Sequence, residues 1–147
     1  MLTKLIRLAA GAACLALAAT AYADGGTLRV DVSGFRNGKG NLACALFAEE
    51  KSFPDGAAAL AKVKTAASQP AAACVFRDVK PGRYAVLVLH DENSNGQMDR
   101  SWLFSMPLEG YGVSNNKTYA THAPRFEEAA FVFAGQPEQV LNVTLRY

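Results

Sequence analysis

Short apolar runs separated by turn residues constrain the fold of this chain more than any other feature. Residues 27–33 alternate strictly, with Leu28, Val30 and Val32 on one side and polar side chains on the other. A period of two is typical of a strand with one buried face. Residues 83–90 are apolar on both sides, which is typical of a central strand that is covered on both faces.

Four further runs have the same strand-like character, and turn signals such as Asn37-Gly38 and Pro81-Gly82 separate the runs. We predict strands over residues 41–48, 74–79, 129–134 and 139–147. Several short strands between turns favour an all-β fold, an antiparallel β-sandwich of about seven strands.

One segment departs from the strand pattern. Residues 54–68 are rich in alanine and lysine, and Leu60 and Val63 have helical spacing. We predict one short helix here, between the second and third strands, capped near Ser52 or Asp55.

The first residues have the pattern of a secretory signal peptide. Lys4 and Arg7 precede an apolar stretch over residues 8–19, and Ala21-Tyr22-Ala23 is a small-x-small cleavage pattern. We predict a cleaved signal peptide over residues 1–23, a single domain over residues 24–147, and a periplasmic or secreted location. The alternatives are a retained anchor, for which the apolar stretch is shorter than the roughly 20 residues of a membrane span, and lipidation at Cys14. We expect no transmembrane segment in the mature chain.

The charge balance excludes one class of partner. The chain has 15 basic and 13 acidic residues, and removal of Lys4 and Arg7 leaves the two signs equal. No cluster of Lys and Arg is interleaved with aromatic residues. We therefore expect no nucleic-acid partner, and we expect a monomer.

Two cysteines remain in the predicted mature chain. Cys44 and Cys74 each lie in a strand-like run, in phase with core residues. Two cysteines in a small exported domain usually pair, so we predict a Cys44–Cys74 disulfide. The alternative is two separate buried thiols.

The segment that carries most chemistry follows the strand over residues 83–90. Oxygen side chains recur at Asp91, Asn93, Asn95 and Asp99, and Gln97 can add its backbone carbonyl. This spacing lets one loop wrap a hard cation such as Ca²⁺. With few carboxylates, binding is expected to be weak, with a Kd of about 10⁻⁴ to 10⁻³ M.

A metal-free reading of the same loop stays open. Asn95-Gly96 is a strong hairpin signal, because both residues accept a positive φ, and Asp and Asn side chains bond their own backbone in such turns. An EF-hand is excluded, because a strand leads into the loop and Trp102 stands where a bidentate Glu is required. A zinc site is not indicated, because His90 and His122 have no third ligand at suitable spacing.

The long stretch over residues 100–128 combines aromatic residues with turn residues. Long irregular segments inside a small domain are often functional. We predict that the aromatic residues cap one end of the core; the alternative is a ligand surface beside the cation loop. The candidate binding residues are Trp102, Tyr111, Ser114, Asn115, Asn116 and Phe126.

Several strings of residues resemble known families. Residues 80–86 resemble the turn and strand of transthyretin-like (prealbumin-like) and carboxypeptidase-regulatory-like sandwiches. Residues 90–99, 107–116 and 124–131 resemble the bacterial secreted family called domain of unknown function 2141. The resemblance implies an exported prealbumin-like sandwich whose three strings meet at one end. It transfers no activity and no catalytic residues.

Together these observations favour a non-catalytic module of the cell envelope, either structural or binding a glycan or a protein, with a weak calcium-type loop. The alternative is a metal-dependent hydrolase or lyase that uses Asp91 to Asp99. No nucleophile-elbow pattern surrounds Ser114, so the sequence predicts no catalytic residue.

Overall fold

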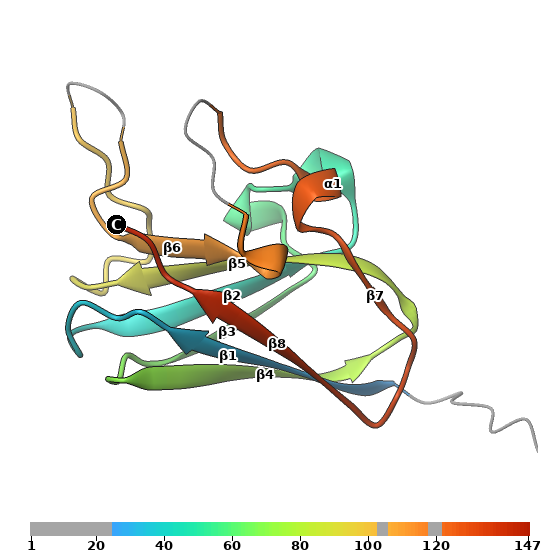
Figure 1. Ribbon diagram of the computed structural model, residues 1–147. Helices are drawn as coiled ribbons and strands as arrows, with labels where there is room; N and C mark the ends of the chain where they lie inside the picture. Colours follow the sequence, from blue (N-terminus) through green and yellow to red (C-terminus); the bar gives the residue numbers. More distant parts are fainter. Residues whose placement is uncertain (1–24, 103–105, 118–121) are drawn as a thin grey trace, which may run out of the picture.

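The computed structural model describes residues 25–102, 106–117 and 122–147, and these form two β-sheets that pack against each other (Figure 1). The first sheet has the order β4 (Ala71–Val79), β1 (Gly26–Ser33) and β8 (Glu138–Thr144). The second has the order β3 (Ala61–Ala66), β2 (Asn41–Phe47), β5 (Gly82–Asp91) and β6 (Gly110–Val113), and β7 (Phe131–Phe133) pairs with the start of β5. The all-β, sandwich-like prediction is confirmed, with one difference: β1 and β8 run parallel.

The inner faces of the two sheets form the main core, as the alternation in sequence predicts. Leu28, Val30 and Val32 of β1 are fully buried, while the residues between them are more exposed. Val86 and Val88 of β5 face them from the second sheet and are also fully buried. The alternation along β1 therefore reflects one face that packs in the core and one face that does not.

The predicted disulfide is confirmed and joins the two sheets. Cys44 lies on β2 and Cys74 on β4, with their Cα atoms 6.4 Å apart. Both residues are buried in the core between the sheets. The bond thus crosses the core and links its two layers covalently.

The helix predicted over residues 54–68 is wrong. The chain instead forms two short 3-10 turns, η1 (Glu50–Ser52) and η2 (Gly56–Ala58), followed by β3. Asp55 does act as a cap, but of η2, where its carboxylate accepts the N–H of Ala57. The physical reason is pairing: an extended segment makes a full antiparallel ladder with β2 and places Val63 opposite Cys44 against the core. That ladder and the burial outweigh the helical propensity of alanine and lysine.

A second apolar cluster covers part of the outer face of the five-stranded sheet. Phe47 of β2 and Ala85 of β5 lie on this face and pack with Phe126 and Ala129. The last two belong to α1 (Phe126–Ala129), which replaces the beginning of the strand predicted over residues 129–134. In Figure 1, α1 and the turns before β3 lie on the side of this sheet that faces away from β1, β4 and β8.

The predicted signal peptide lies outside the described residues. No helix among residues 25–102, 106–117 and 122–147 is long and apolar enough to cross a bilayer.

Candidate functional site

The candidate cation loop, residues 91–99, begins where β5 ends. We call it the Asp91 loop, because its first residue organises it. Asp91 is fully buried. Its Oδ1 accepts the N–H of Asn95 at 3.0 Å, and its Oδ2 accepts the N–H of Gly96 at 2.9 Å. Gly96 has a φ of +80°, a conformation that glycine adopts at no steric cost. One buried carboxylate therefore closes the turn from inside.

The other predicted ligands gather around Asp99. The Nδ2 groups of Asn93 and Asn95 donate to the two oxygens of Asp99 at 2.6 and 2.9 Å. The Oδ1 of Asn93 accepts the N–H of Asn95, and the Oδ1 of Asn95 accepts the N–H of Gln97 at 2.8 Å. The structure thus brings together the side chains of Asp91, Asn93, Asn95 and Asp99, whereas Gln97 contributes its backbone N–H.

A carboxylate that was not predicted from the sequence, Glu109, accepts hydrogen bonds from both ends of this loop. Glu109 is 4% exposed, and it accepts the N–H of Glu92 at 2.9 Å and the N–H of Asp99 at 3.1 Å. It reaches the loop from the residue before β6, which runs back beside β5. No local pattern points to Glu109, because its partners come from the far side of the loop.

A buried histidine supports the base of the loop from below. The Nε2 of His90 lies 2.7 Å from the carbonyl oxygen of Lys39, so this nitrogen carries the hydrogen and donates. Its Nδ1 lies 2.7 Å from the hydroxyl of Tyr147, which also accepts the N–H of Arg36. Burial raises the pKa of Tyr147. His90 is therefore a satisfied structural group at the end of β5.

Glu92 holds a short ion pair beside this histidine. Its carboxylate accepts from Arg36 at 2.6 Å and from Asn37 at 3.1 Å. Burial on its own raises the pKa of Glu92, but these hydrogen bonds and the Arg36 charge outweigh burial and bring the pKa below its usual value. The carboxylate of Glu92 therefore points toward Arg36, away from the side chains that gather around Asp99.

The predicted ligand residues of the loop include only two carboxylates. Among the residues that the structure describes, no three His, Cys, Asp or Glu side chains are grouped so as to hold a metal ion. The candidate cation loop has Asp91 and Asp99 with amides between them, which is the low-charge ligand set expected of a weak site. Calcium binding stays a prediction.

The candidate binding residues fall into two groups. Trp102 is 92% exposed, on a hairpin in which Ser101 donates to the carbonyl of Met106 and Leu108 donates to that of Asp99. Tyr111 is half-buried on β6, next to this hairpin. We call residues 99–102 and 106–108 the Trp102 hairpin; Figure 1 shows it projecting from the sheets.

The other candidates hold the second apolar cluster in place. Ser114 is fully buried; its hydroxyl accepts the N–H of Val86 at 2.9 Å and donates to the carbonyl of Ala129 at 2.5 Å. Asn115 donates to the carbonyl of Ala130 at 3.0 Å. A buried hydroxyl with both roles used supports the fold and does not face a ligand.

Two more of these residues also make contacts within the fold. Asn116 is exposed, but its amide bridges to β8, accepting the N–H of Thr144 and donating to the carbonyl of Asn142 at 2.8 Å each. Phe126 is 5% exposed and packs in the second apolar cluster. Neither Ser114 nor Phe126 lines the surface.

The prediction that the three strings meet at one end is right only for the start of the second string, since Glu109 bonds to the loop and Gly110 pairs with the residue before it. Ser114 bonds to Val86, which precedes Asp91 along β5 by about 16 Å at the usual rise per residue. The antiparallel pairing of β6 with β5 is the reason, because β6 carries the chain away from the Asp91 loop before Ser114 is reached. The Trp102 hairpin stays with the loop, while Ser114 and α1 lie farther back.

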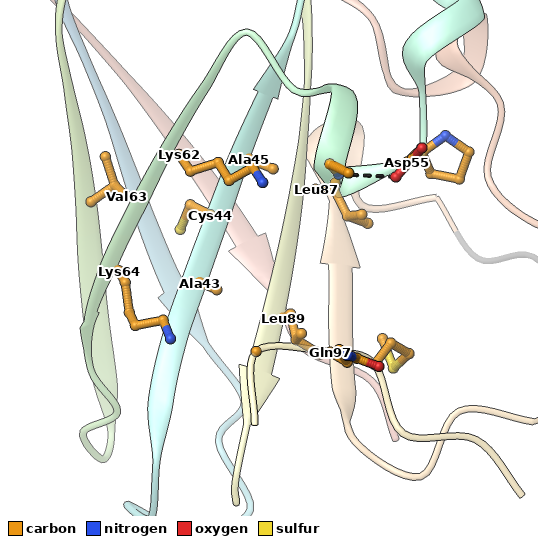
Figure 2. Close-up of a pocket in the computed structure, with 15 residues that line it drawn as sticks. Ala43, Cys44, Ala45, Asp55, Lys62, Val63, Lys64, Leu87, Leu89 and Gln97 are labelled. Atoms are coloured by element: carbon orange, nitrogen blue, oxygen red, sulfur yellow. Dashed lines mark hydrogen bonds between the residues drawn. The ribbon is translucent and has the colours of Figure 1, made fainter. Parts of the chain in front are cut away.

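A concave surface next to the Asp91 loop was not found from sequence. On the outer face of the second sheet, the register sets Ala43 between Lys64 and Leu89, and Ala45 between Lys62 and Leu87. These six residues, with the segments 54–57 and 96–98 at its ends, line a trough of about 740 Å³ (Figure 2). The signal was present as small residues alternating with large ones in β2, and lysines alternating with apolar residues in β3.

Comparison with known proteins places the chain in a family but gives it no activity. No curated protein and no solved structure matches it. The model of a family described as an uncharacterized protein conserved in bacteria (DUF2141) matches residues 30–141, which span the two sheets from β1 to β8 and include the Asp91 loop. The chain therefore belongs to this bacterial family, DUF2141.

Proposed function

We propose that this chain is an exported, non-catalytic binding module of the cell envelope, whose partner is an envelope glycan or protein. The Trp102 hairpin carries the proposal. Trp102 is 92% exposed, and Met106 and Leu108 on the returning strand are 61% and 51% exposed. Exposed apolar groups gathered on one projection mark interaction sites, and tryptophan is enriched among the residues that dominate binding energy.

Two features support export. The predicted signal peptide over residues 1–23 is one. The other is the Cys44–Cys74 disulfide, since such bonds form and persist in oxidising compartments. The transthyretin-like relationship of the sandwich belongs to the same proposal and is supported by the turn and strand over residues 80–86.

The test uses the single tryptophan of the chain as a site-specific probe. Purified cell-wall glycan and detergent-solubilised envelope proteins are titrated separately while tryptophan emission is recorded. We expect a blue shift with one of them. Because Trp102→Ala removes this probe, the affinities of wild type and variant are compared by calorimetric titration, in which the variant should lose at least tenfold. Leu60→Ala, at a 63% exposed position outside the hairpin, is the matched control. Unchanged emission together with equal affinities of wild type and Trp102→Ala would refute the proposal.

The proposal includes a weak Ca²⁺ ion in the Asp91 loop, with Asp91, Asn93, Asn95 and Asp99 as side-chain ligands. The spacing of these residues along the chain and the gathering of their side chains in one turn support it. An ion present at ten times its Kd stabilises the folded state by about 1.4 kcal/mol. We therefore expect millimolar calcium to raise the Tm of the wild type but not of Asp99→Asn, with Asp55→Asn as the control. Equal Tm values in calcium and in chelator would end this part of the proposal.

The alternative, a metal-dependent hydrolase or lyase, gains no support from the contacts of Asp91. Both of its oxygens accept backbone N–H groups, which is the role of a clamp within the turn. A turnover that Asp99→Asn abolishes in a broad hydrolase and lyase screen would revive this alternative.

A further inference from the structure

We propose that the trough on the outer face of the second sheet binds a linear amphiphile with one anionic head, namely a long-chain carboxylate. The site is separate from the Trp102 hairpin and so goes beyond the proposed function. Four observations carry the proposal: the shape of the trough, its apolar wall, its saturated floor and the charge of its other wall.

The shape fits a narrow chain. Ala43 and Ala45 form the floor, and their methyl groups lie between longer side chains on both neighbouring strands. Cross-strand neighbours on one face are about 5 Å apart, so two alanines in a row leave a channel about one strand wide. The segments 54–57 and 96–98 complete its lining. A volume of about 740 Å³ lies within the usual range of small-molecule sites.

One wall of the trough is apolar. Leu87 and Leu89 of β5 stand along it and are only partly buried by the protein itself. Met98 extends this wall at the end formed by the Asp91 loop, and Pro54 lies at the opposite end. A hydrocarbon chain in the trough would remove this surface from water, which is the main driving force for apolar ligands.

The floor offers no backbone groups to a ligand. β2 lies between β3 and β5 and pairs antiparallel with both, so its N–H and C=O groups are used in the two ladders. A peptide or a sugar lying on this floor would lose hydrogen bonds to water and find no replacement there. An alkyl chain makes no such demand, which favours a lipid-like ligand.

The other wall is cationic. Lys62 and Lys64 lie on this face of β3, and Figure 2 shows both side chains reaching across β2 toward Ala45 and Ala43. Neither lysine has an ion pair within the residues described. Asp55 carries the one carboxylate of the described lining, and that group already accepts the N–H of Ala57.

Two like charges on alternate residues of one strand repel each other, and an anion between them relieves that repulsion. The methylene stems of the lysines add apolar cover while their ammonium groups stay in water. A carboxylate head beside Lys62 and Lys64, with its chain along Leu87 and Leu89, satisfies both walls at once.

The experiment is calorimetric titration of the full mature protein with laurate below its micelle-forming concentration. We expect saturable binding that tightens by about two- to fourfold for each methylene from eight to twelve carbons. Dodecyltrimethylammonium, which has the same chain length and the opposite charge, should bind at least tenfold more weakly. The double variant Lys62→Gln/Lys64→Gln should weaken laurate by about five- to tenfold and leave the neutral twelve-carbon alcohol within about twofold.

Two further variants locate the site. Ala43→Leu fills the floor and should weaken laurate and the alcohol alike, whereas Ala71→Leu, on an exposed position of β4, should change neither. Lys80→Gln, in an exposed turn, is the control for charge removal. Because the lysines are exposed, their variants decide the question even if Ala43→Leu fails to fold.

Three results would overturn the proposal: no laurate binding, laurate and dodecyltrimethylammonium binding equally, or the double lysine variant binding laurate like the wild type. Trp102→Ala separates this inference from the proposed function. It should weaken binding to the envelope partner at least tenfold and leave laurate affinity unchanged, so either proposal can fail alone.

Discussion

The outer face of the second sheet has a covered half and an open half, and the same two strands, β2 and β5, run through both. In the covered half, Phe47 and Ala85 lie beneath α1 and Phe53 and are fully buried. In the open half, Ala43 and Leu89 line the trough and are only partly buried. The difference arises from what the rest of the chain lays over each half.

Three aromatic rings account for the covered half. Phe53 packs edge-to-face on Phe47 with centroids 5.0 Å apart, and Phe126 packs on Phe53 at 6.2 Å. In the open half, the neighbours of Ala43 and Ala45 on β3 are Lys64 and Lys62. Apolar rings hold a cover in place, whereas lysines keep their surface in contact with water. The open half is therefore a surface that the rest of the fold leaves uncovered, beside a half that it covers.

The largest effect is expected for a buried ring in the covered half. It tests whether the covered half contributes more to the free energy of unfolding than the open half does. Phe47→Ala removes a fully buried ring and should lower the free energy of unfolding by about 3–5 kcal/mol. Leu89→Ala, in the open half, should cost less than about 1 kcal/mol, because the side chain already faces solvent in part. Urea unfolding measures both. Equal losses would mean that the trough is part of the stabilising core.

The disulfide allows the inner face of β2 to be tested apart from its outer face. Cys44 lies on β2 between the two floor alanines, with its side chain on the opposite face. The bond closes a loop with a sequence separation of 30, so Cys44→Ala/Cys74→Ala should lose about 3–4 kcal/mol of unfolding free energy. The laurate affinity of the folded variant should stay within about twofold. A variant as stable as the wild type would show that packing alone holds the sheets together.

A smaller loss of unfolding free energy is expected for Ser114, whose hydroxyl joins β5 to α1 over the covered half. Ser114→Ala leaves the N–H of Val86 and the carbonyl of Ala129 without this partner in a buried place, which should cost about 1–3 kcal/mol. Ser33→Ala, at an exposed position of β1, should change the free energy of unfolding by less than about 0.5 kcal/mol. Equal values for the two variants would show that Ser114 does not fasten the cover.

The strands that could be predicted are those whose hydrophobic pattern lies within the strand itself. The alternation in residues 27–33 reports one buried face, and the apolar run in residues 83–90 reports two, whichever strands pair with them. β3 was missed because its own residues favour a helix, and only the free edge of β2 makes the extended form better. β6 has four residues, too few to show a period.

In the candidate site, too, contacts between residues close in sequence were predictable, and contacts that depend on strand pairing were not. The turn made by Asp91 depends on residues four and five positions later, so the motif alone was enough to indicate it. The clamp by Glu109 and the burial of Ser114 depend on how β6 pairs with β5, which no local pattern reports. The trough needs the register of three strands at once, so it became visible only in the folded chain.

The smallest expected effect concerns the exposed edge of the cover, where Arg83 of β5 bonds both oxygens of Glu127 at 2.7 and 2.5 Å. The hydrogen bond from Arg83, helped by its charge, lowers the pKa of Glu127. A lowered folded-state pKa gives stability that is present above the unfolded pKa, about 4.3, and is lost as the pH falls through the folded value.

The Tm difference between wild type and Glu127→Gln should therefore be small at pH 7 and shrink further as the pH falls below about 4.3. It should also shrink in 1 M salt, because both side chains are at least half exposed. A double-mutant cycle with Arg83→Gln isolates the pair. A coupling that persists after Glu127 has been protonated would mean that the two side chains hold the edge of the cover by packing, and that the covered half is closed up to its edge.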